Sequence, residues 1–156
     1  MVFGEGDPGA DVVFVGEGPG ADEDRTGRPF VGQAGKLLEA MLAAVGLGRE
    51  HVYIANIVKC RPPRNRNPEG DEMDACQPFL DRQIELIEPR VIVTLGKVAA
   101  NRLLGTSAPI SALRGRWHTY RGTPLLPTFH PAYLLRSPLE KRAAWQDLKA
   151  LLRKLG

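Results

Sequence analysis

Cysteine is scarce in this chain, which holds only Cys60 and Cys76 among its 156 residues. Two thiols do not make a disulfide-rich scaffold, and they fall short of the about four ligands that a zinc site or an iron–sulfur cluster takes. We expect both thiols to be reduced, because cytosolic proteins keep most cysteines in that form. Cysteine therefore predicts neither a cross-linked fold nor a complete metal centre.

Long apolar runs are also missing. No run approaches the roughly 18 residues that cross a membrane, and no secretory signal is visible at the N-terminus. Internal repeats, linkers and low-complexity tracts are absent as well. We therefore expect a cytoplasmic protein with no membrane partner, folded as one domain over residues 1–156.

Neither sign of charge dominates the sequence. A net charge of +3 favours an anionic partner only weakly. Arginines gather in residues 61–66 and 114–121, and acidic residues gather in 22–24 and 69–74. Such a basic cluster is either a solvated face or a phosphate-binding surface, and composition leaves both open.

Short apolar runs alternate with segments of helical periodicity. The pattern predicts strands at 12–15, 52–55 and 91–95, followed by a hairpin or a last strand within 116–129. It predicts helices at 34–45, 72–87, 96–104 and 139–155. Such alternation is typical of an α/β fold in three layers, with a mostly parallel sheet between two layers of helices.

A glycine-rich loop follows the first predicted strand. Its sequence is GEGPG at 16–20, then acidic residues at 22–24, then GRPFVG at 27–32. Glycines permit tight turns and a close approach of backbone to ligand. The Walker pattern is absent, the glycine spacing differs from the dinucleotide fingerprint, and the carboxylates would repel a pyrophosphate. A nucleotide-binding α/β protein is therefore disfavoured, and Glu17 becomes the centre of interest.

The loops after four strands should meet at one edge of a parallel sheet. They begin with Glu17, Asn56, Gly96 and His130, and Phe30 can add an aromatic wall from the first loop. This would bring a carboxylate, an amide and an imidazole to one crevice. From the residues alone, each also fits an ordinary role as a loop cap, a turn amide or a loop histidine.

Four segments in order resemble the motifs of a family 4 uracil-DNA glycosylase, the bacterial and archaeal type that normally carries a [4Fe-4S] cluster. These segments are 16–20, 27–32, 56–63 and 130–136. The resemblance implies a central parallel four-stranded sheet flanked by helices. It also implies a monofunctional hydrolase, acting as a monomer in base excision repair. Such an enzyme flips uracil out of single- or double-stranded DNA and hydrolyses the N-glycosidic bond, leaving an abasic site.

The resemblance also assigns roles to the residues of the crevice. Phe30 would stack on the flipped uracil, with Gly16 lining the pocket. Asn56 would read the base edge, because its amide oxygen accepts from uracil N3–H and its nitrogen donates to O4. His130 would stabilise the charge that develops on uracil O2. Glu17 would lie near the sugar and position water or stabilise an oxocarbenium-like transition state.

Contacts to DNA are expected from the segment after His130 and from arginines. The segment 131–136 would enter the minor groove, where Leu134 is either an apolar wedge or a buried loop leucine. Phosphate contacts are expected from Arg61, Arg64, Arg66, Arg114, Arg116 and Arg136.

The cysteines are where the chain departs from the family pattern. Cys60 and Cys76 match the second cysteine pair, whereas the first pair belongs to an N-terminal extension that we expect this chain to lack. The resemblance thus implies a [4Fe-4S] cluster, and the cysteine count argues against it. A different class of function stays open, namely a uracil-DNA-binding or damage-sensing module with little turnover. The presence of Glu17 and His130 favours the enzyme.

Overall fold

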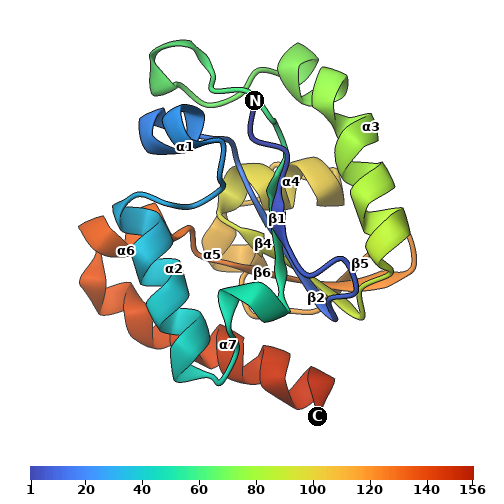
Figure 1. The fold of residues 1–156 in the computed structure, drawn as a ribbon. Coiled ribbons are helices and arrows are strands. Elements are labelled where there is room, and N and C mark those ends of the chain that lie inside the picture. The colour runs from blue at the N-terminus through green and yellow to red at the C-terminus, as the bar shows by residue number, and fades with distance from the viewer.

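A twisted sheet of six strands runs through the centre of the protein (Figure 1). The computed structural model describes residues 1–156 apart from the side chain of Asn65. The strands are β1 (Glu5–Gly6), β2 (Val12–Gly16), β3 (Tyr53–Asn56), β4 (Val91–Leu95), β5 (His118–Tyr120) and β6 (Thr123–Thr128). Their order across the sheet is β1-β3-β2-β4-β6-β5, and the four inner strands run parallel.

The two edge strands correct the prediction of a four-stranded sheet. Strand β1 pairs antiparallel with β3, and β5 pairs antiparallel with β6. The four-stranded sheet was implied by the family resemblance, and β2 and β4 could be recognised because both are mostly apolar, as is typical of parallel strands buried on both faces. Strand β5 lies within the segment 116–129, for which a hairpin or a last strand was predicted, whereas β1 is a Glu-Gly pair with no apolar run to signal it.

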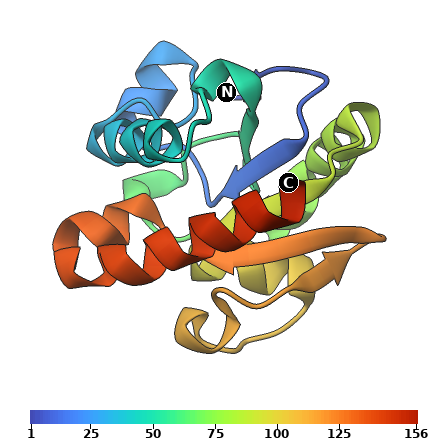
Figure 2. The ribbon, with the colours of Figure 1, turned by 90° about the horizontal axis from the view of Figure 1, so that it is seen from below.

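Helices cover both faces of the sheet, as the alternating pattern predicted. The α-helices are α1 (Ala21–Thr26), α2 (Gln33–Ala44), α3 (Gly70–Ile87), α4 (Lys97–Leu104), α5 (Ile110–Leu113), α6 (Pro131–Arg136) and α7 (Lys141–Leu155). Helices α2 and α7 pack on Phe14 and its neighbours, and α3 and α4 pack on Val13 and Ile92 from the opposite face. Figure 2 shows α7, in red, running alongside β6. No helix in the described part of the chain is long and apolar enough to span a membrane.

Single turns of 3-10 helix complete the connections, at Arg49–His51, Pro63–Asn65 and Pro138–Glu140. Three of the α-helices were not predicted, namely α1, α5 and α6. Each has six residues or fewer, which is too short for an apolar periodicity to be detected. Two of them matter for function, because α1 lies within the glycine-rich loop region and α6 begins directly after His130.

A buried carboxylate ties the last helix to the sheet. Asp147 of α7 is 2% exposed and accepts a hydrogen bond of 2.6 Å from the Thr128 hydroxyl at the end of β6. Its carboxylate also pairs with the Arg114 guanidinium through contacts of 2.6 and 3.1 Å. Arg114 donates a further bond to the Ala143 carbonyl. The pair thus joins α7, β6 and the end of α5.

Breaking this pair should destabilise the fold strongly. We expect Asp147→Ala to lower the free energy of unfolding by about 3 kcal/mol, because it removes the carboxylate partner of a partly buried guanidinium and of a buried hydroxyl. Urea denaturation measures the change. Asp74→Ala is the matched control: Asp74 pairs with the comparably buried Arg102 at 2.7 Å, but its own side chain is 71% exposed. The control should cost about 1 kcal/mol or less; equal losses would contradict a special role for Asp147.

Candidate active site

Three of the predicted residues line one small cavity at the carboxyl end of the parallel strands. Phe30, Asn56 and His130 border a space of about 60 Å³, together with Gly18, Glu23 and Ala34. Glu17 lines an adjoining space of about 160 Å³, and Gly18 borders both. The convergence of loops that the sheet topology predicted is therefore observed for Glu17, Asn56 and His130.

Gly16 makes room for the other side chains of the pocket. It ends β2 and is the register partner of Asn56 in β3. A Cβ atom on Gly16 would lie 2.5 Å from Asn56 Oδ1 and 2.5 Å from Phe30 Cζ. Any larger residue would therefore displace the amide or the ring. The Gly16 carbonyl also accepts a bond of 2.9 Å from the Ile57 N–H, which fixes the end of β2 against the residue after β3.

Phe30 forms an aromatic wall beside His130. The two ring centroids lie 5.5 Å apart, with an angle of 34° between the ring planes. Phe30 is buried, yet its backbone has a φ of 50°, in the left-handed region that bulky residues avoid. Such a conformation persists only where the surrounding structure imposes it, and residues of this kind gather at functional sites.

Asn56 carries an unpaired acceptor into the pocket. The residue is 2% exposed, and its Oδ1 atom has no hydrogen-bond partner among the described residues. A buried carbonyl oxygen left without a donor costs about 1–3 kcal/mol, so such groups are rare in folded proteins. The Asn56 oxygen can therefore accept a hydrogen bond from the N–H group of a ligand that lies against the Phe30 ring.

His130 is held as a neutral imidazole. It caps the N-terminus of α6, where its Nδ1 atom accepts a hydrogen bond of 3.0 Å from the Ala132 N–H. Burial, aided by the nearby positive charge of Arg136, lowers the pKa of His130 to about 4. Near neutral pH the ring is therefore uncharged, and because Nδ1 is the acceptor, the remaining proton sits on Nε2.

Glu17 is half-buried at the start of the glycine-rich loop. Its carboxylate makes no hydrogen bond or ion pair with any side chain that the structure describes. Burial raises the pKa of Glu17 above its ordinary value of 4.5. The loop is anchored to the sheet because the Glu17 carbonyl accepts from the Val58 N–H at 3.1 Å.

Glu23 is a pocket residue that the sequence analysis missed. One carboxylate oxygen accepts from the Gly20 N–H at 3.0 Å, and the other accepts from the N–H groups of Val31 and Gly32 at 2.9 and 3.0 Å. The Glu23 side chain thus binds the backbone at residue 20 and at residues 31–32, on either side of α1, and it also borders the cavity. The signal was the capping spacing of Gly20 and Glu23, which is hidden within the acidic cluster 22–24.

Leu134 is not exposed, so it is not the apolar wedge that would enter the minor groove, which was one of the two alternatives for this residue. It is 0% exposed and packs with Phe129 and Ala144, so the alternative of a buried leucine is correct. The exposed apolar side chains of α6 are Tyr133, at 37%, and Leu135, at 43%. A helix turns about 100° per residue, so neighbouring positions face different sides, which the expectation of a loop could not foresee.

The basic residues divide into two groups. Arg114 was predicted to contact DNA; its guanidinium pairs with the buried Asp147 and is 25% exposed, and its contact with DNA stays a prediction. Arg66 pairs with Glu72 at 2.6 Å. Exposed arginines from the predicted set are Arg61, Arg64, Arg116 and Arg136. Arg136, at the end of α6, makes no ion pair with any side chain in the described part.

The two cysteines lie close to one point of the fold. The Cys76 sulfur accepts a hydrogen bond of 3.3 Å from the backbone N–H of Lys59, the residue before the exposed Cys60. Among the described residues, no group of three or more His, Cys, Asp or Glu side chains is placed to hold a metal ion. The residues of this chain therefore do not by themselves fit the four-thiolate set of a [4Fe-4S] cluster.

Comparisons with known proteins agree with this geometry. The model of the uracil DNA glycosylase superfamily matches residues 3–149. A type-4 uracil-DNA glycosylase of Thermotoga maritima is 47% identical and aligns over 100% of this chain and 85% of its own. Those of Sulfurisphaera tokodaii and Saccharolobus solfataricus are each 45% identical, over 96% and 95% of this chain and 72% and 73% of their own. The matches include every strand end that borders the pocket, and the chain therefore belongs to the uracil DNA glycosylase superfamily.

Proposed function

We propose that this protein is a monofunctional uracil-DNA glycosylase that flips uracil out of DNA and hydrolyses its N-glycosidic bond. The abasic product would pass to base excision repair. The names of the relatives support this activity, and one observation of the structure carries it: the buried, unpaired Oδ1 of Asn56 beside the Phe30 ring. A flat base with an N–H on its edge would stack on the ring and supply the missing donor.

Asn56 selects the base in this proposal. Its Oδ1 accepts from uracil N3–H, and its amide nitrogen donates to uracil O4. Cytosine offers an acceptor at N3 and a donor at N4, so both contacts would fail in the buried site. Because each unpaired buried polar group costs about 1–3 kcal/mol, two such failures are enough to reject cytosine by several orders of magnitude.

His130 stabilises the leaving group. When the bond between the sugar and uracil N1 breaks, the electron pair goes to the base and negative charge develops on O2. The Nε2–H of the neutral ring donates a hydrogen bond to that oxygen. Because the pKa of His130 is about 4, the ring is neutral near pH 7 and acts as a hydrogen-bond donor that keeps its proton. The bond from Ala132 to Nδ1 sets this orientation in advance.

Glu17 acts on the sugar side. As the base leaves, the sugar gains oxocarbenium character, and a carboxylate nearby stabilises that positive charge. The same oxygens can orient a water molecule for attack on the anomeric carbon and accept its proton. Each of these roles needs the ionised form of Glu17. Water is the co-substrate, and the products are free uracil and an abasic site.

DNA binding would centre on α6 and the exposed arginines. Arg136, Arg61 and Arg64 are proposed to contact phosphates, which gives affinity without sequence preference. Tyr133 and Leu135 replace Leu134 as the apolar side chains that can enter the groove, because they are the exposed ones. We further propose that the protein acts as a cytoplasmic monomer, since its substrate is cellular DNA and one chain supplies the whole pocket.

One assay tests the proposed function directly. The protein is incubated with an end-labelled oligonucleotide that contains a single uracil, treated with alkali and run on a gel. We expect strand cleavage at the uracil and none in a thymine-containing control. Tight binding to the uracil strand without cleavage would favour the alternative of a damage-sensing module.

Asn56→Asp should change the base that is released. The acid replaces the amide donor by an acceptor for cytosine N4–H and, when protonated, can also donate to cytosine N3. Single-turnover rates on uracil and cytosine oligonucleotides should show a loss of uracil release of about a hundredfold or more and slow cytosine release. Gln146→Glu makes the same exchange on the exposed face of α7 and should leave both rates unchanged. Full uracil release by Asn56→Asp would exclude Asn56 from base reading.

The rate should fall at acid pH because of Glu17. Its raised pKa means that the carboxylate takes up a proton at a higher pH than an exposed glutamate, whereas His130 stays neutral down to about pH 4. Single-turnover rates should therefore decrease as pH falls through a pKa above 4.5. Glu17→Gln should release uracil more slowly, and its rate should no longer fall as the pH is lowered to about 5. If the rate of Glu17→Gln falls at acid pH as the wild-type rate does, the titration belongs to another group.

Arg136 should contribute one phosphate contact. Plotting the logarithm of the DNA-binding constant against that of salt concentration gives a slope set by the number of phosphates neutralised. We expect Arg136→Ala to reduce this slope by about one. Arg153→Ala, which removes an exposed charge from the last turn of α7, serves as the control and should leave the slope unaltered. Identical slopes for all three proteins would place Arg136 away from the phosphates.

A further inference from the structure

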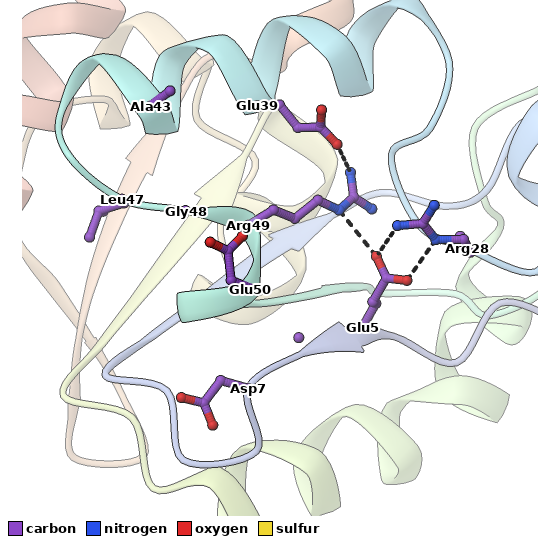
Figure 3. A pocket seen from close by; sticks show the side chains of 10 residues that line it. Glu5, Asp7, Arg28, Glu39, Ala43, Leu47, Gly48, Arg49 and Glu50 are labelled. Atoms are coloured by element: carbon purple, nitrogen blue, oxygen red, sulfur yellow. Dashed lines mark hydrogen bonds and ion pairs between the residues drawn. The ribbon is translucent and has the colours of Figure 1, made fainter.

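A wide hollow bordered by several charged side chains lies beside β1, apart from the pocket of Phe30, Asn56 and His130. It has a volume of about 710 Å³ and is bordered by α2 and by the 3-10 turn Arg49–His51. Figure 3 shows the Arg49 guanidinium between the carboxylates of Glu39 and Glu5, with Arg28 on the other side of Glu5. The Arg49 side chain is only 11% exposed, so most of it is buried in the wall of the hollow and little of it reaches solvent.

Arg49 binds the backbone of the loop that carries the aromatic wall. Its Nη1 donates a hydrogen bond of 2.5 Å to the Phe30 carbonyl, and its Nη2 donates to the Pro29 carbonyl. The planar fork of a guanidinium holds two neighbouring carbonyls through donors fixed in direction, whereas the three donors of an ammonium group are compact and rotate freely. Arg49 thus reaches from one side of the fold to the chain that places the Phe30 ring in the pocket.

The Phe30 carbonyl is also confined by helix α2. A Cβ atom on Gly35, in the first turn of α2, would lie 1.8 Å from this oxygen. The oxygen is therefore both packed against helix backbone and hydrogen-bonded by Arg49. These two contacts help explain how an aromatic residue is kept at a φ of 50°.

Two carboxylates hold Arg49 in place. Its Nε lies 3.1 Å from Glu5 Oε2, and its Nη1 lies 3.3 Å from Glu39 Oε1. The hydrogen bond from Arg28, together with Arg49, keeps the pKa of Glu5 below its ordinary value, so Glu5 is ionised. Arg28 shares Glu5 with Arg49, but it binds that carboxylate through its guanidinium and the Thr26 hydroxyl through its backbone N–H, rather than the Phe30 carbonyl.

We propose that Arg49 is a positioning residue for base release, acting through the Phe30 backbone to hold the aromatic wall against the flipped base. The inference rests on the proposed glycosylase function. Arg49 itself touches neither the base nor the reacting bond. Its action differs from general stabilisation in one respect: it matters for catalysis only while the Phe30 ring is present.

A double-mutant cycle tests this dependence. We expect Arg49→Lys to lower the single-turnover rate on uracil DNA by roughly 10- to 100-fold, as small misplacements of pocket groups do. Affinity for DNA, which depends on phosphates, should change by less than about twofold. In a Phe30→Ala background, which is itself slow, adding Arg49→Lys should lower the rate by no more than about a further twofold.

Arg28→Lys is the matched control. It makes the same exchange on the other partner of Glu5 and should keep the rate within about twofold of wild type. Urea denaturation checks that each variant is folded. If Arg49→Lys is unfolded, Gly35→Ala displaces the same carbonyl from the α2 side, and its loss of rate must likewise disappear in the Phe30→Ala background.

The outcomes separate the two proposals. A wild-type protein that releases no uracil overturns the proposed function, and the role of Arg49 with it. A wild type that releases uracil, combined with losses from Arg49→Lys and Phe30→Ala that multiply, overturns the role of Arg49 alone. So does a wild-type rate in the folded Arg49→Lys variant.

Discussion

Parallel pairing of β2 with β3 on one side and β4 on the other is the constraint on which the site depends. This pairing sets Gly16 opposite Asn56 and directs the chain after both strands to the same edge. Strand β6 joins the sheet beside β4, also in parallel, so His130 arrives at that edge from the far end of the sequence. Residues more than a hundred positions apart are brought together by hydrogen bonds between strands rather than by contacts among themselves. The pocket is consequently as rigid as the sheet at its base, while its outer wall depends on loops.

The pocket includes several groups that are unfavourable for stability. Asn56 keeps a buried oxygen without a partner, Phe30 has a left-handed backbone, and burial shifts the pKa of both Glu17 and His130 against their charged forms. Each of these costs free energy in the absence of a ligand. The fold offsets the cost by fixing the loop backbone. Glu23, which borders the pocket, binds three N–H groups, and Arg49, which borders the hollow beside β1, binds two carbonyls. Charged side chains thus serve the pocket in two ways, some by facing the ligand and others by holding the loop.

Sequence reasoning predicted the parts of the site that depend on strand ends, and it failed where short helices and tertiary partners decide. Gly16, Asn56 and His130 could be placed because each ends or follows an apolar run, and the parallel topology did the rest. Leu134 was uncertain because a six-residue helix leaves no periodicity to read, so the buried face of α6 could not be told from its exposed one. The ion pair of Arg114 could not be foreseen because its partner, Asp147, is distant in sequence and is buried only once α7 has packed on β6. Glu23 and Arg49 were missed for a related reason: they bind main-chain atoms, and a sequence does not show which backbone groups need a partner.

The distribution of charge explains how an acidic pocket can act on a polyanion. Glu17 and Glu23 border the two adjoining cavities, so in the proposed mechanism the phosphates of DNA would be repelled at close range and held by arginines outside, such as Arg136. In that mechanism the carboxylates would become favourable only when the glycosidic bond breaks and positive charge develops on the sugar. On the base side the protein presents a neutral imidazole, which would donate to the developing anion without forming an ion pair with Glu17 in the ground state. Because such a pocket would gain most of its electrostatic stabilisation during bond breaking rather than on binding, we expect its charges to lower the barrier more than they strengthen the complex with substrate.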